Sequence, residues 1–121
     1  PAYSDGRIAI TGPEIDVGSK AATPIALVFH ELATNAMKYG ALSNADGAIA
    51  LALTQDEETV SFVWTETGAD VSEGDEPVPG FGTRLLDLAI NQQLGGSYVR
   101  TWNADGLTLT MTVRRDRVQD L

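Results

Sequence analysis

The longest regular pattern in the chain is helical, and it separates apolar from polar side chains. Over residues 24–39, apolar side chains recur at four- and three-residue steps, at Val28, Leu32, Ala36 and Tyr39. This spacing places them on one face of an α-helix. We expect the helix to begin at Pro24 with Thr23 as its N-cap and to stop at Gly40. A helix of this length needs a sheet or another helix to cover its apolar face.

The remaining apolar runs supply that cover. Short alternating or continuous runs predict strands at residues 7–11, 48–53, 60–65, 97–102 and 107–113. A second amphipathic segment predicts a helix at residues 81–94, and the turn at residues 103–106 predicts that the last two strands form a hairpin. We therefore expect an α+β fold, a two-layer α/β sandwich in which helices cover one face of a mixed β-sheet. Residues 1–121 fit one domain.

Composition excludes several classes of function. The chain has 8 Lys and Arg against 17 Asp and Glu, a net charge of -9, which disfavours nucleic acid and direct contact with anionic membranes. The absence of cysteine excludes disulfides, and a single histidine disfavours a structural zinc site. No apolar run approaches the roughly 20 residues of a membrane span. A cytoplasmic domain is the simplest interpretation.

The predicted first helix also carries a polar strip. Glu31, Asn35 and Lys38 have the spacing i, i+4, i+7, which places them at about 0°, +40° and −20° around the helix. Carboxylate and amide oxygens suit Mg²⁺, and an amine neutralises phosphate. From spacing alone, a solvated helix face with a loose ion pair is the simpler interpretation of the strip.

A glycine-containing segment precedes the second helix. Gly80 and Gly82 allow backbone N–H groups to approach an anion, Thr83 can cap the helix, and Arg84 can contact a phosphate. An ordinary turn before a helix explains this feature as well. The P-loop pattern is absent, and so is a dinucleotide fingerprint, because Leu85 stands where a third glycine is required. The loop between Gly68 and Gly80 is long enough to suggest a function.

Three segments together resemble one family. HELATNAMKYGALS at residues 30–43 resembles the N box of the HWE group of sensor histidine kinases, WTE at residues 64–66 resembles its W-x-E motif, and GFGTRL at residues 80–85 resembles its second glycine box. The motifs occur in the family's order, and the resemblance extends over nearly the whole chain. It implies the Bergerat ATP-binding fold, with ATP and Mg²⁺ as ligands.

The resemblance also implies roles for individual residues of the N box. Asn35 would be the Mg²⁺ ligand, and Glu31 the catalytic acid or base beside the γ-phosphate. Lys38 would contact phosphate, and Tyr39 would border the nucleotide. His30 belongs to the same box, so we expect that it is not the phosphorylated histidine.

Further roles follow from the other two motifs. Glu66 would receive the adenine amino group, Gly68 keeps the acid-x-Gly pattern, and we interpret Trp64 as core support that positions Glu66. Residues 69–79 would form the ATP lid, although Ala69 and Asp70 replace the usual Gly-Pro. The remaining nucleotide contacts would be Gly80, Phe81, Gly82, Thr83 and Arg84, with Thr108 as a weaker candidate near the adenine.

The family further implies partners that this chain does not contain. The phosphoacceptor histidine would lie on a separate dimerisation helix of the same kinase, and the phosphate would pass to an aspartate of a response regulator. Two alternatives stay open at this point. One is an anti-sigma-factor-like kinase that phosphorylates serine, and the other is a degenerate, non-catalytic docking or phosphotransfer module.

Overall fold

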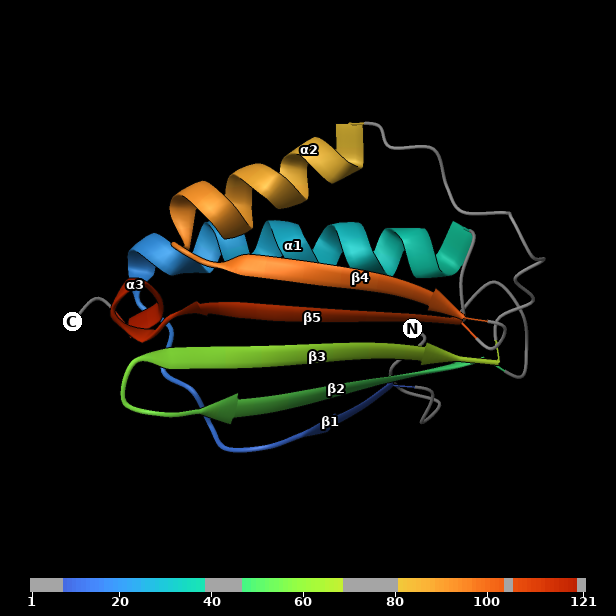
Figure 1. The fold of residues 1–121 in the computed structure, drawn as a ribbon, viewed down its shortest axis with the longest axis horizontal. Helices are drawn as coiled ribbons and strands as arrows, with labels where there is room; N and C mark the ends of the chain where they lie inside the picture. Colours follow the sequence, from blue (N-terminus) through green and yellow to red (C-terminus); the bar gives the residue numbers. More distant parts are fainter. Residues whose placement is uncertain (1–7, 39–46, 69–80, 104–105, 120–121) are drawn as a thin grey trace.

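Five strands form one mixed sheet with the order β1-β2-β3-β5-β4 (Figure 1). The computed structural model describes residues 8–38, 47–68, 81–103 and 106–119. The strands are β1 (Ile8–Thr11), β2 (Ala48–Gln55), β3 (Thr59–Thr67), β4 (Ser97–Asn103) and β5 (Gly106–Arg114). β1 pairs with β2 in parallel, and every other pair is antiparallel. The predicted strands are therefore confirmed, and so is the hairpin pairing of the last two.

The core lies on the helix-covered face of the sheet. Along β3, Val60, Phe62 and Trp64 are buried, and the alternation continues to Glu66, which is buried too. Trp64 lies opposite Leu51 of β2 and Leu109 of β5, so large side chains meet across three central strands. This is the period-two burial expected of a sheet with one covered face.

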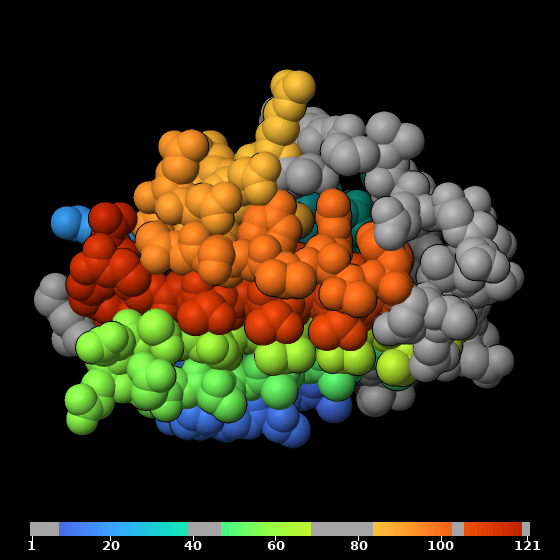
Figure 2. Space-filling view, in the orientation of Figure 1, coloured from blue at the N-terminus to red at the C-terminus, as the bar shows by residue number. Residues whose placement is uncertain are grey.

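Helices cover that face and leave the other open. They are α1 (Ser19–Lys38), α2 (Phe81–Asp87), the π-helical segment η3 (Leu88–Gln93) and the short α3 (Arg115–Gln119). α1 packs against the other three. In the space-filling view, β4, β5, β3 and β2 form successive bands on the side shown (Figure 2). The predicted α+β sandwich is confirmed. Among the described helices, none is long and apolar enough to cross a membrane.

The first helix begins earlier than predicted. Ser19 is already helical, and Pro24 lies inside α1 and is buried, so Thr23 is not the N-cap. The Gly18 carbonyl instead accepts the N–H groups of Ala21 and Ala22, at 3.2 and 3.1 Å. A proline in the second turn removes one backbone hydrogen bond. Burial of Ala21 and Pro24 against the core offsets that loss.

The second helix is present but changes its winding. After Asp87 the chain continues as a π-helix, in which the Leu94 N–H donates to the Ala89 carbonyl at 3.0 Å. At the change, the Tyr98 hydroxyl donates to Asp87 at 2.6 Å and ties the helix to β4. Burial, and then the Asp87 carboxylate, raise the pKa of Tyr98 to about 12. The junction therefore stays tied across the physiological pH range.

The turn between β2 and β3 gives a pH-dependent prediction. Asp56 accepts the backbone N–H groups of Thr59 and Glu58, at 2.7 and 2.8 Å. These bonds, with the Thr59 amide first, hold the pKa of Asp56 below its usual value. The resulting stabilisation is complete above the unfolded pKa of about 3.9 and is lost as pH falls through the folded pKa.

We therefore expect Asp56→Asn to be less stable than the wild type at pH 6, with the difference shrinking toward pH 3. Asparagine keeps one acceptor oxygen but does not titrate, and every other carboxyl group is common to both proteins. Urea unfolding midpoints at several pH values measure this difference. A difference that stays constant over the range contradicts the prediction.

Candidate functional site

The ends of one helix and two strands, and the start of a third strand, lie at the same end of the molecule. The C-terminal ends of α1 and β3 lie there, together with the end of β4 and the start of β5 (Figure 1). The side chains carried by the last turns of α1 and the last residues of β3 therefore belong to one region. Four of the predicted site residues are on these two segments: Glu31, Asn35, Lys38 and Glu66.

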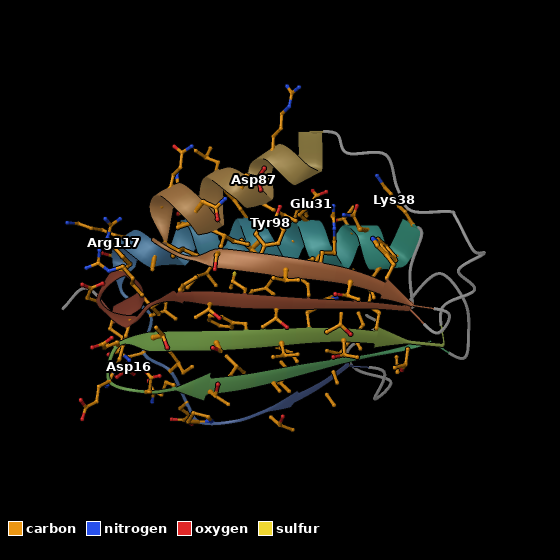
Figure 3. All side chains as sticks on the ribbon, in the orientation of Figure 1. Asp16, Glu31, Lys38, Asp87, Tyr98 and Arg117 are labelled. Carbon is orange, nitrogen blue, oxygen red and sulfur yellow. The ribbon has the colours of Figure 1, made fainter. Side chains whose placement is uncertain are left out.

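The polar strip of α1 is present in this region. Residues 31, 35 and 38 are all helical, so the wheel positions of about 0°, +40° and −20° hold. Glu31 and Lys38 project from the same side of α1 (Figure 3). Glu31 and Asn35 are half-buried, and Lys38, the last residue of the helix, is exposed. An acid, an amide and an amine thus follow one another along one strip.

His30 lies on a different face of α1. It is exposed, and it lines an open hollow of about 430 Å³ together with Ala22, Thr23, Ala26 and Leu27. One residue step turns an α-helix by about 100°, so His30 faces well away from Glu31. The helix does not bring His30 to the polar strip.

Glu66 is the buried charged residue of the described core. Its exposure is 3%, and the Trp64 indole Nε1–H donates to its Oε2 at 2.9 Å. Burying a carboxylate is costly unless hydrogen bonds satisfy it. The predicted role of Trp64 as core support that positions Glu66 is confirmed by this bond and by the burial of its ring.

The packing of Phe29 on β3 shows which part of α1 lies beside Glu66. Its ring lies 5.7 Å from Phe62 and 6.1 Å from Trp64, between centroids. α1 and β3 run in the same direction (Figure 1). Glu66 lies about 10 Å beyond this contact along β3, at about 3.3 Å per residue. The same distance covers about seven residues of α1, so Glu66 is roughly level with residues 35 and 36 of the helix.

Two glycines shape the sheet end around Glu66. Gly106 has φ +157°, and a Cβ placed on it would lie 2.1 Å from the Glu66 carbonyl oxygen. Only glycine allows β5 to approach β3 this closely. Gly68 follows β3 with φ +72°, a left-handed conformation that favours glycine. Sequence reasoning missed Gly106, which it treated as a turn residue only.

The other predicted contacts lie on α2, on β5 or outside the described residues. Phe81, Gly82 and Thr83 form the first turn of α2, so Thr83 stands inside the helix, and the exposed Arg84 follows. Thr108 pairs with Thr65, on the open face, whereas Glu66 faces the core. The structure therefore does not bring Thr108 to Glu66. Tyr39, Gly80 and the predicted lid at 69–79 lie outside the described residues.

The donor set suits a magnesium ion that also binds phosphate. No group of three or more His, Cys, Asp or Glu side chains that could hold a metal occurs in the described parts of the chain. Mg²⁺ usually keeps several waters and binds through one or two protein oxygens plus substrate phosphates. Asn35 and Glu31, one turn apart on α1, fit that mode of binding.

Comparison with known proteins yields clear relatives. The chain is 40% identical over 109 residues to blue-light-activated histidine kinase 1 of Erythrobacter litoralis (strain HTCC2594), covering 88% of this chain and 30% of the relative. It is 31% identical over 119 residues to the blue-light-activated histidine kinase of Rhizobium johnstonii, covering 92% of this chain and 32% of that protein. The chain thus spans less than a third of these relatives' length. No protein-family model matches it.

The chain is similar to one part of these histidine kinases. The histidine kinase domain of the E. litoralis EL346 blue-light-activated kinase matches the fold with a TM-score of 0.77 and 20% identity, over 98% of this chain and 61% of that one. The catalytic domain of histidine kinase ThkA matches with a TM-score of 0.66 and 16% identity, over 93% of this chain and 83% of that one. The fold is therefore that of histidine kinase catalytic domains. The named relatives, rather than the fold, confirm the resemblance of the sequence to histidine kinases.

The close contact between Gly106 and Glu66 can be tested by substitution. We expect Gly106→Ala to lower the free energy of unfolding by more than about 1 kcal/mol, because the new Cβ meets backbone in a conformation that disfavours it. Thr110→Ala, at an exposed position of the same strand, is the control and should stay within about 0.5 kcal/mol of the wild type. Urea unfolding measures both. Equal effects would contradict the close approach.

Proposed function

We propose that this histidine kinase domain binds ATP with Mg²⁺ at the end of the sheet and donates the γ-phosphate to a histidine on a separate dimerisation helix. One observation carries the proposal. A buried carboxylate, Glu66, lies near the end of β3, at the end of the molecule where the last turns of α1 carry the acid, amide and amine strip. The two features suit the two ends of a nucleotide.

Glu66 is suited to the base end. A carboxylate accepts hydrogen bonds only, and adenine presents an amino group as a donor. Away from water, such a charge-assisted bond is stronger than a neutral one. Glu66 lies on the buried face of β3, whose other residues are apolar, and such surroundings suit a flat base.

The α1 strip is suited to the phosphate end. Asn35 offers an amide oxygen to Mg²⁺, Lys38 offers a positive charge to phosphate, and Glu31 can accept a proton from the attacking nucleophile. When bound, Mg²⁺ neutralises phosphate charge that develops during transfer. Phosphoryl transfer depends mainly on positioning and charge stabilisation, so a rigid helix is an apt carrier for these groups. Gly82, Thr83 and Arg84, at the start of α2, would add donors to the phosphates.

The acceptor histidine lies outside this domain in the proposal. His30 faces away from the strip, so the domain has no histidine of its own where the phosphate would be transferred. The similarity to named histidine kinases favours histidine over serine as the acceptor. A response regulator would then receive the phosphate from that histidine.

The metal-dependent part of binding should depend on Asn35. We expect Asn35→Ala to reduce MgATP affinity at least tenfold, because the substitution removes the amide ligand, while weak Mg²⁺-free binding is retained. Asn91→Ala changes the same residue type at an exposed position of η3 and should bind as the wild type does. Isothermal titration with ATP, with and without Mg²⁺, separates the two contributions. Equal loss in both variants, or in neither, argues against Asn35 as the ligand.

Phosphoryl transfer should require an added acceptor. With radiolabelled ATP, we expect no stable phosphohistidine on the domain alone, because His30 faces away from the strip. Adding the dimerisation segment of a blue-light-activated relative should give label on that segment, sensitive to acid as phosphohistidine is. A His30→Gln variant of the domain should support the same transfer. Label that appears on His30 of the wild-type domain would refute this assignment.

A further inference from the structure

We propose that Trp64 selects the nucleotide base, because its indole N–H holds the Glu66 carboxylate in one orientation that favours adenine over guanine. This inference rests on the proposed function, since it requires the base to reach Glu66. It assigns to Trp64 a positioning role, which acts through Glu66 and requires no contact with the phosphates.

The bond between the two side chains is well placed to fix the carboxylate. The indole Nε1 lies 2.9 Å from Glu66 Oε2, and the exposed fractions of Trp64 and Glu66 are 5% and 3%. Water therefore does not compete for either group. A hydrogen bond to a charged acceptor is stronger than one between neutral groups, and an acceptor that loses its donor in a buried site is strongly destabilised.

The indole itself has little freedom to move. Trp64 stands between Leu51 and Leu109 on the neighbouring strands, and both of these side chains are buried. Phe29 of α1 packs on the ring, with 6.1 Å between centroids and 30° between planes. A donor fixed by three neighbours in this way directs its N–H along one line.

The backbone of Glu66 is fixed as well. Gly106 lies so close to the Glu66 carbonyl that no side chain fits between β5 and β3 at this point. The main chain of Glu66 is thus held by the sheet, and its carboxylate by Trp64. Both the position and the plane of the carboxylate are set before a base arrives.

A fixed carboxylate distinguishes the two purines. Adenine offers an amino donor at its C6 position, where guanine has a carbonyl oxygen that a carboxylate repels. Guanine offers its N1–H and 2-amino group side by side, a pair that suits both oxygens of a carboxylate free to turn. With Oε2 engaged by Trp64, Glu66 is oriented for the single donor of adenine. Without the indole N–H, the carboxylate can turn toward the guanine pair.

The test compares base selectivity among matched variants of the domain. Dissociation constants for ATP and GTP, each with Mg²⁺, are measured by calorimetry for the wild type, Trp64→Phe and Trp102→Phe. We expect Trp64→Phe to weaken ATP binding about tenfold and to narrow the ratio of GTP to ATP dissociation constants. Trp102→Phe makes the same change on β4, at a half-buried tryptophan, and should leave the ratio unchanged.

A second variant separates the N–H from the volume of the ring. Benzothienylalanine at position 64 keeps the shape of tryptophan but lacks the donor, so it should fold and show the same loss of selectivity. It decides the matter if Trp64→Phe does not fold. A wild type that binds no ATP overturns both the proposed function and this inference. A wild type that binds ATP, with an unchanged ratio in the isosteric variant, overturns this inference alone.

Discussion

A carboxylate that leaves water must find hydrogen-bond donors, and Glu66 imposes this requirement on the sheet end. The buried face of β3 continues past Trp64 to Glu66, where a hydrophobic residue would be the usual choice. The fold accommodates the charge through the indole two residues earlier, which points to the same face because strand side chains alternate. If Glu66 served only the stability of the fold, an apolar side chain at this position would make the protein more stable. Its presence in the core is therefore best explained by function.

The directions of the α1 side chains follow from the way the helix packs. Val28, Leu32 and Ala36 are buried against the sheet, and this contact fixes the rotation of the helix about its axis. Once that rotation is set, the strip of Glu31 to Lys38 and the outward face of His30 are set too. The two adjacent residues of the sequence pattern HE thus have unrelated surroundings. A long helix anchored along its length holds the strip more rigidly than a loop would.

Much of this arrangement was predictable from local pattern. Period-two alternation identified the core face of β3 and β5, and helical spacing identified the strip on α1, because each follows from backbone geometry. The start of α1 was predicted too late, since burial of Ala21 and Pro24 outweighs the helix-breaking tendency of proline. The π-helical winding after Asp87 was not predictable, because apolar spacing over six residues does not distinguish it from an α-helix. The short α3, with Val118 buried, has too few residues to give a periodic signal.

Long-range contacts set the limit of prediction for the site. The W-x-E pattern indicates that Trp64 and Glu66 share a face, but nothing local shows that Gly106, forty residues away, presses on the Glu66 backbone. Thr108 shows the opposite case. The family resemblance suggests a place for it near the adenine, yet near the start of β5 the register with Thr65 turns it to the open face. A strand residue near the site belongs to it only if its side chain lies on the same face of the sheet as Glu66. Strand pairing decides that face.

The overall acidity of the chain does not prevent it from holding a polyanion. Charges more than about 8–10 Å apart are largely screened at physiological ionic strength, so the net charge of -9 acts weakly on a phosphate bound at one end. The charged groups within that distance therefore determine how strongly a phosphate is attracted. On α1 these are one acid, one amide and one amine, whose charges nearly cancel, so the strip alone attracts a triphosphate weakly. In the proposed complex, a divalent cation held between Asn35 and the phosphates would change that balance. The oxygen ligands that α1 offers fit such a cation.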